Sequence, residues 1–153
     1  METSQPEKSD KKATRILIVE DVANVATVLK ARLETFGYEI CDVVNTGQKA
    51  IDGAIRCRPD LVLMDIMLEG VMTGIEAASE IQKKMSVPII YLSCLSDNQV
   101  MDRAIETNPY GYIVKPYDSA ELRFSIENAL RKHQQEMLRE ALIADLEKSR
   151  PSS

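Results

Sequence analysis

Five side chains that could handle phosphate stand where short apolar runs end: Glu20, Asp21, Asp65, Ser93 and Lys115. Carboxylates gathered in one partly buried place repel one another, and a hard divalent cation such as Mg²⁺ relieves that repulsion. The cation would also neutralise phosphoryl oxygens and leave Asp65 ionised as a nucleophile. Lys115 and Ser93 would bind further phosphoryl oxygens. The set therefore predicts Mg²⁺-dependent phosphoryl transfer onto Asp65.

The apolar runs themselves predict the elements that position these side chains. Residues 16–19 and 61–64 are continuously apolar, as in parallel strands that helices cover on both faces. Segments with helical spacing alternate with the strand-like segments 16–19, 38–44, 61–64, 87–92 and 110–114. We therefore expect an α/β domain, a doubly wound, flavodoxin-like (βα)5 parallel five-stranded sheet with helices on both faces. The carboxyl ends of such strands form the functional crevice.

Length and charge limit the remaining classes. The 153 residues suit one domain, and the net charge of −5 opposes direct nucleic-acid binding. We find no continuous apolar stretch of about 18 residues and no secretory signal, so we expect no membrane span and a cytoplasmic protein. We divide the chain into a disordered leader (residues 1–14), one domain (15–132) and an amphipathic helical extension or linker (133–153).

Four blocks carry a resemblance to a known family: ILIVED at 16–21, LVLMDIM at 61–67, IYLS at 90–93 and GYIVKP at 111–116. They resemble the response-regulator receiver domains of two-component signal transduction, of the chemotaxis-regulator-like kind. The resemblance covers residues 14–132, with the blocks in the family's order. It implies a regulatory phosphoacceptor domain that catalyses only its own phosphorylation and slow dephosphorylation.

The resemblance also implies a role for each matched position in the site. Asp65 would accept the phosphoryl group from a sensor histidine kinase or a histidine phosphotransfer protein, and Lys115 would contact that group. Asp21, Asp65 and the backbone carbonyl of Met67 would bind Mg²⁺ directly. Glu20 would act on the metal through a bound water.

Further positions would convert phosphorylation into a changed surface. Ser93 would be the switch hydroxyl, and Tyr112 the switch aromatic that turns inward. The Lys115–Pro116 peptide would be cis, as is usual in the family. The changed surface would bind a downstream protein or a fused output module, and a homodimer is a further alternative.

The sequence departs from the common family pattern in three places. The first acid is Glu20 where Asp is more frequent, and its longer arm still reaches a metal-bound water. The loop 68–74 lacks the usual proline and is one residue longer. Cys94 follows the switch hydroxyl where Ala is common, and we hypothesise that its bulk slows the access of water to the acyl phosphate.

Other interpretations of the same residues stay open. Glu20 and Asp21 could simply cap a helix, and Tyr112 could be ordinary packing. A haloacid-dehalogenase-like phosphatase would need a second acid where Met67 stands. A flavin-binding module would need a phosphate-cradling loop in place of Glu20 and Asp21. A receiver-like scaffold that takes no phosphate is the remaining alternative.

The last helix is expected to begin at residue 118 or 119 and to extend beyond the end of the domain. Its later apolar residues alternate with charges but sustain no heptad repeat. The extension could fold back, pair with another chain, lead to an output module or do nothing. His133, the only histidine, is expected to be exposed and without a role.

Overall fold

The computed structural model describes residues 12–94, 98–107 and 109–149. The sequence also predicts that Ser96 caps the helix that ends near residue 107. Ser96, most of the expected leader and the last four residues lie outside this part of the chain. The strands are β1 (Arg15–Val19), β2 (Glu39–Val44), β3 (Leu61–Asp65), β4 (Ile89–Ser93) and β5 (Gly111–Val114). The helices are α2 (Ala23–Thr35), α3 (Gly47–Cys57), α4 (Gly74–Lys84), α5 (Asn98–Glu106) and α6 (Ser119–Lys148).

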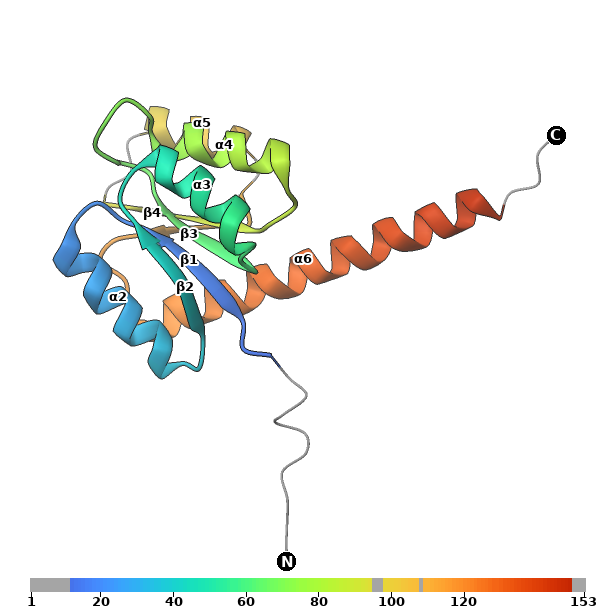
Figure 1. Cartoon of the computed structure of the whole chain (residues 1–153), viewed down its shortest axis with the longest axis horizontal. Coiled ribbons are helices and arrows are strands. Elements are labelled where there is room, and N and C mark those ends of the chain that lie inside the picture. The colour runs from blue at the N-terminus through green and yellow to red at the C-terminus, as the bar shows by residue number, and fades with distance from the viewer. Residues whose placement is uncertain (1–11, 95–97, 108, 150–153) are drawn as a thin grey trace, which may run out of the picture.

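The strands form one parallel sheet in the order β2-β1-β3-β4-β5 (Figure 1). The order runs outward from β1 in both directions, so the expected doubly wound (βα)5 topology is confirmed. The direction changes between β1 and β3, and such a switch point opens a crevice at the carboxyl ends of the two strands. Glu20 and Asp21 follow β1, and Asp65 ends β3.

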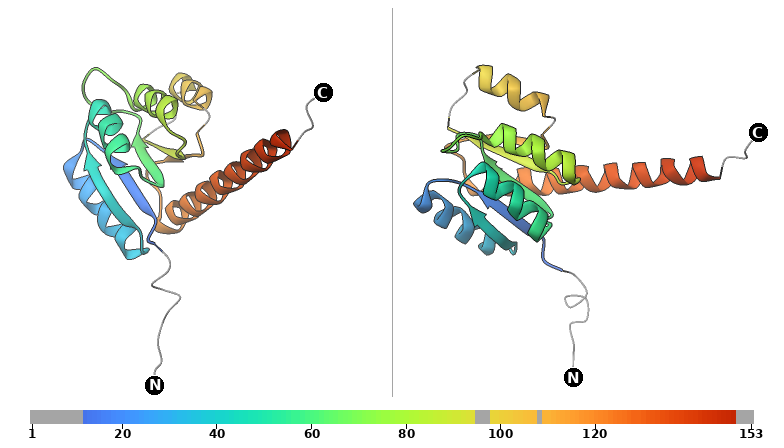
Figure 2. Two further views of the ribbon diagram at one scale, coloured as in Figure 1. Left: turned by 45° about the vertical axis from the view of Figure 1, so that its right-hand side comes forward. Right: turned by 45° about the horizontal axis from the view of Figure 1, so that its top comes forward.

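The continuous apolar runs are buried because helices cover both faces of the sheet (Figure 2). Along β1, Leu17 and Val19 pack on the side of α3 and α4, whereas Ile16 and Ile18 pack on the side of α2 and α6. All four of these residues have no exposed surface. Because side chains alternate along a strand, each strand contributes to two apolar layers, one on each side of the sheet.

Three strands, β2, β4 and β5, begin one or two residues later than the sequence predicts. Tyr38 does not start β2, because its N–H donates to the Leu33 carbonyl 3.2 Å away and closes the end of α2. Gly37 makes that turn with a φ of +96°, a conformation that glycine adopts without steric cost. β4 begins after Pro88, which has no N–H to offer a neighbouring strand.

The start of α4 is fixed by a reciprocal cap. The Thr73 side chain accepts from the N–H of Glu76 at 3.1 Å, and the Glu76 carboxylate accepts from the N–H of Thr73 at 3.0 Å. This capping box closes the loop that follows Asp65. In the described part of the chain, no helix is both long and apolar enough to cross a membrane.

Candidate functional site

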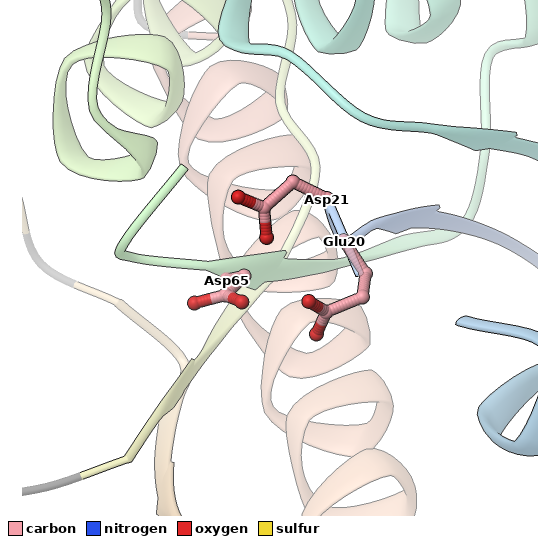
Figure 3. A group of neighbouring side chains, drawn as sticks. All are labelled: Glu20, Asp21 and Asp65. Carbon is pink, nitrogen blue, oxygen red and sulfur yellow. The ribbon is translucent and has the colours of Figure 1, made fainter. Parts of the chain in front are cut away.

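Three carboxylates converge at the carboxyl ends of β1 and β3 (Figure 3). One oxygen from each of Glu20, Asp21 and Asp65 lies within 4.8 Å of the others. Glu20 is only 2% exposed and Asp65 only 6%, while Asp21 is half-buried. The arrangement is an acidic cluster at the topological switch point of the sheet.

Backbone N–H groups of the surrounding loops hold each carboxylate in place. Val22 donates to Oε2 of Glu20 at 3.2 Å, and Met67 donates to Oδ1 of Asp65 at 3.0 Å. The N–H of Glu69 donates to Oδ2 of Asp21 at 3.1 Å, which ties the loop after β3 to the loop after β1. These bonds orient the acids before any ligand arrives.

Lys115 brings the positive charge to the cluster. Its Nζ donates to Oε1 of Glu20 at 3.1 Å and to Oδ2 of Asp65 at 3.4 Å. The backbone of Lys115 is held by its N–H, which donates to the Ser93 carbonyl at 2.6 Å. The Lys115–Pro116 peptide is cis, as the family resemblance implied.

Burial and neighbouring charge shift the pKa values of this group. Burial raises the pKa of Glu20 above its ordinary value, and the hydrogen bond and charge of Asp65 raise it further. The contact with Lys115 lowers that pKa but does not offset the rise. Burial lowers the pKa of Lys115, but attraction to Asp65 and Glu20 outweighs burial and raises it overall. The site therefore holds Lys115 charged and favours the protonated form of Glu20.

The donor set fits a small divalent cation. Three carboxylates face a single ammonium in a partly buried place, so the cluster carries an excess of two negative charges when all four groups are ionised. All the clustered acid ligands are oxygens, which Mg²⁺ and Ca²⁺ prefer. The backbone of Met67 lies beside this acid cluster, because its N–H donates to Oδ1 of Asp65.

Ser93 and Tyr112 lie on the two strands beyond β3. Ser93 ends β4, is 2% exposed and pairs in register with Val114 of β5. Tyr112 pairs with Tyr91, and its ring packs against the core on the α3 and α4 side. Its hydroxyl is buried and has no hydrogen-bond partner in the described part of the chain, so it is not bonded to Ser93. A buried hydroxyl without a partner costs about 1–3 kcal/mol.

A cleft of about 510 Å³ opens beside Glu20 and Asp21, between α2 and the loop after β2. Lys30 and Lys49 stand in its lining. Neither lysine was predicted from the sequence, because they come from two helices and no local pattern joins them. A ligand that reaches the acidic cluster through this cleft would therefore pass two positively charged side chains.

The expectation that His133 is exposed is wrong. Its Nε2 lies 3.0 Å from Oγ of Ser86, and its ring meets the Tyr110 ring edge-on at a centroid distance of 5.7 Å. His133 is half-buried at the opposite end of the strands from the acids. Only the tertiary fold brings these residues together, since Ser86 is 47 positions away in the chain.

The comparisons with known proteins agree with this architecture. The family model for the response regulator receiver domain matches residues 16–127. The transcriptional regulatory protein PdtaR of Mycobacterium tuberculosis is 36% identical over 132 residues, which are 86% of this chain and 64% of PdtaR. The DNA-binding response regulator MtrA of Mycobacterium bovis is 34% identical over 87% of this chain and 58% of its own length. The chain thus spans less than two thirds of these relatives.

Solved structures show the same fold. The signal receiver domain of a modulated diguanylate cyclase from Desulfovibrio desulfuricans G20 is 37% identical, with a TM-score of 0.78 over 82% of this chain and 99% of that one. The BeF3-activated receiver domain of RstA from Klebsiella pneumoniae is 30% identical, with a TM-score of 0.72 over 77% of this chain and 99% of that one.

Proposed function

Because this chain belongs to the response regulator receiver domain family, which acts in two-component signalling, we propose that it is a phosphoaspartate switch with Asp65 as acceptor. The observation that carries the proposal is the position of the Asp65 carboxylate, 3.4 Å from Nζ of Lys115 and within 4.8 Å of two further acids. The arrangement supplies a nucleophile, a cation for the phosphoryl group and a metal-binding set in one place.

The proposed step is a phosphoryl transfer from a phosphohistidine of a sensor histidine kinase or a histidine phosphotransfer protein. An Asp65 oxygen attacks phosphorus, the new P–O bond forms, and the P–N bond to the donor imidazole breaks. The electron pair of that bond stays on the departing nitrogen. The imidazole leaves as a neutral ring, because its other nitrogen already carries a proton or because the departing nitrogen takes one up. Lys115 stabilises the charge on a phosphoryl oxygen, and the Met67 N–H keeps Asp65 oriented.

Mg²⁺, when bound, would supply positive charge that lets the acids and the phosphoryl oxygens approach one another. Asp21, Asp65 and the Met67 carbonyl would hold it directly, and Glu20 would act through a water molecule. The half-buried Asp21 and the buried Asp65 come from neighbouring strands, which suits them to share one ion.

The readout would pass through Ser93 and Tyr112. Ser93 would bind the phosphoryl group, and the ring of Tyr112, which already packs against the core, would shift to a second buried position. The unsatisfied Tyr112 hydroxyl supports this proposal, because the present position leaves a polar atom that a second position could pair. The altered surface would bind a downstream protein or an attached output module, in the cytoplasm. We propose that residues 15–132 form the switch and that 133–153 connect it to its output.

Intact-mass spectrometry after incubation with acetyl phosphate tests the proposal. We expect a gain of one phosphoryl group that needs Mg²⁺ and is lost in Asp65→Asn. Asp52→Asn is the matched control, because Asp52 is an exposed acid on α3. Modification that persists in Asp65→Asn, or that proceeds fully in the presence of a chelator, would contradict the proposal. Failure with acetyl phosphate and with phosphoramidate would favour the phosphate-independent scaffold.

A further inference from the structure

Helix α6 continues far past the domain on which it begins. It runs without interruption from Ser119 to Lys148, 30 residues, or about 45 Å at 1.5 Å per residue. Its buried residues are Leu122, Ile126 and Ala129, all in the first half. Every residue from 138 to 149 is exposed, and the helix projects away from the sheet in all the views (Figures 1 and 2).

The projecting part carries an apolar ridge. Leu138, Leu142 and Leu146 are 64%, 60% and 63% exposed. They follow one another at intervals of four residues, so their side chains form a single row along the helix. An isolated helix of about 12 residues is marginal in water, and most helical stability in proteins comes from packing an apolar face. Among the described residues of the chain, none covers this ridge.

The ridge faces away from the domain of its own chain. Leu142 follows Ile126 by 16 residues and Leu122 by 20. At about 3.6 residues per turn, both separations leave Leu142 roughly half a turn from the face that packs on the sheet. A straight α6 therefore presents the ridge outward, where a second helix can reach it without meeting the first domain.

The charges around the ridge suit a second copy of the same segment. Residues 131–149 contain four basic residues (Arg131, Lys132, Arg139 and Lys148) and four acidic residues (Glu136, Glu140, Asp145 and Glu147). The segment is therefore neutral with His133 uncharged, in a chain whose net charge is −5. Two such segments meet without net repulsion.

The positions of two charges favour a parallel arrangement. Arg139 and Asp145 stand three residues before and three after Leu142, on opposite flanks of the ridge. In a parallel two-fold pair, each flank of the contact then receives Arg139 of one copy and Asp145 of the other. An antiparallel pair centred on Leu142 would instead place Arg139 of both copies on one flank and Asp145 of both on the other.

We propose that the part of α6 beyond the domain pairs in parallel with the same segment of a second copy of this chain, through Leu138, Leu142 and Leu146. Leucines spaced by four on both helices suit the packing of ridges into grooves. The two receiver domains lie on the outer sides of the pair, since each ridge faces away from its own domain. The pairing does not depend on phosphorylation of Asp65.

Sedimentation equilibrium of the full chain tests the pairing, with Leu142→Glu as the disrupting variant. We expect a dimer whose dissociation constant rises at least about tenfold in Leu142→Glu, which corresponds to about 1.4 kcal/mol. Ile143→Glu is the matched control, because Ile143 is 48% exposed on the next position and lies off the ridge. Circular dichroism checks that both variants keep their helix.

Three results would overturn the proposal. They are a wild-type monomer at all concentrations, a dimer that Leu142→Glu leaves unchanged, and equal weakening by Ile143→Glu. The first would leave the ridge to a different segment or partner, and the second would place any dimer contact on the receiver domain. The third would show that added charge anywhere on the extension has the same effect.

Cross-linking tests the direction of the pair. Leu146→Cys in a Cys94→Ser background, which removes the exposed native thiol, should form a disulfide between two copies under mild oxidation by copper phenanthroline and oxygen. Parallel helices place the two copies of residue 146 at one level, whereas antiparallel helices centred on Leu142 separate them by about 12 Å. Absence of the cross-linked dimer on a non-reducing gel, with Leu142→Cys cross-linking well, would overturn the parallel arrangement.

Discussion

Gly74 lies so close to Asp65 that a Cβ atom added to it would stand 2.1 Å from the Asp65 carbonyl oxygen. The same atom would stand 2.9 Å from Cα of Ile66. The N–H of Gly74 donates to the Ile66 carbonyl at 2.9 Å, so the first turn of α4 rests on the backbone that carries the acceptor. The position of Asp65 thus depends on a neighbour that has no side chain.

We expect Gly74→Ala to lower the free energy of unfolding by about 3 kcal/mol, because backbone atoms must move to admit the methyl group. The shift would also displace Asp65, so phosphorylation should slow. Gly53→Ala is the control, since a Cβ there would meet its nearest atom, in the Leu17 side chain, at an ordinary 3.5 Å. Alanine in the helix should leave stability unchanged or raise it by about 1 kcal/mol. Urea unfolding curves that coincide for the two variants would contradict this account.

The raised pKa of Glu20 predicts a pH-dependent stability in the absence of divalent metal. An acid whose pKa is higher in the folded state stabilises the protein while it is protonated. That stabilisation is complete below the ordinary pKa of 4.5 and is lost as pH rises through the raised value. Glu20→Gln removes the titration. The difference in unfolding free energy between Glu20→Gln and the wild type should therefore increase from pH 4 to pH 8.

Denaturant titrations at several pH values, in a chelating buffer, measure this difference. Glu69→Gln is the control, because Glu69 lies on the loop beside the site and is exposed. A difference that stays constant with pH would show that the Glu20 carboxyl titrates alike in both states.

Mg²⁺ should stabilise the folded protein more at pH 7.5 than at pH 5. Protons and the metal compete for the same acids, and the raised pKa of Glu20 strengthens that competition as pH falls. At a metal concentration about 100 times the dissociation constant, binding adds about 2.7 kcal/mol. Asp65→Asn should lose most of this gain, and Asp52→Asn should keep it. An equal rise in melting temperature in all three proteins would indicate general salt stabilisation instead.

The sheet could be predicted from the sequence because its strands are buried on both faces, and continuous apolar runs such as residues 16–19 are typical of strands covered in this way. The meeting of the acids was equally predictable, since Glu20, Asp21 and Asp65 stand directly after strands whose carboxyl ends share an edge. The family resemblance implied the cis Lys115–Pro116 peptide, which the structure contains.

Contacts between distant segments could not be predicted from the sequence. The close approach of Gly74 to Asp65 depends on how the capped start of α4 packs against the loop after β3. No periodicity of apolar residues in the sequence encodes that contact. The Lys30 and Lys49 lining of the cleft joins two helices in the same way. Element ends such as Tyr38 were missed because a single tertiary or capping hydrogen bond decides them.

His133 fixes the point at which α6 leaves the domain. Its Nε2 is 3.0 Å from Oγ of Ser86, and its ring packs edge-on against Tyr110. We expect His133→Ala to lower the free energy of unfolding by about 1–2 kcal/mol, through loss of one hydrogen bond and one aromatic contact. Hydrogen exchange should also quicken over residues 133–137, because this turn would no longer be tied to the loop at Ser86. Gln134→Ala, at an exposed neighbouring position, is the control and should change neither quantity. Exchange in His133→Ala that matches the wild type would mean that the buried Leu122, Ile126 and Ala129 alone hold α6 in place.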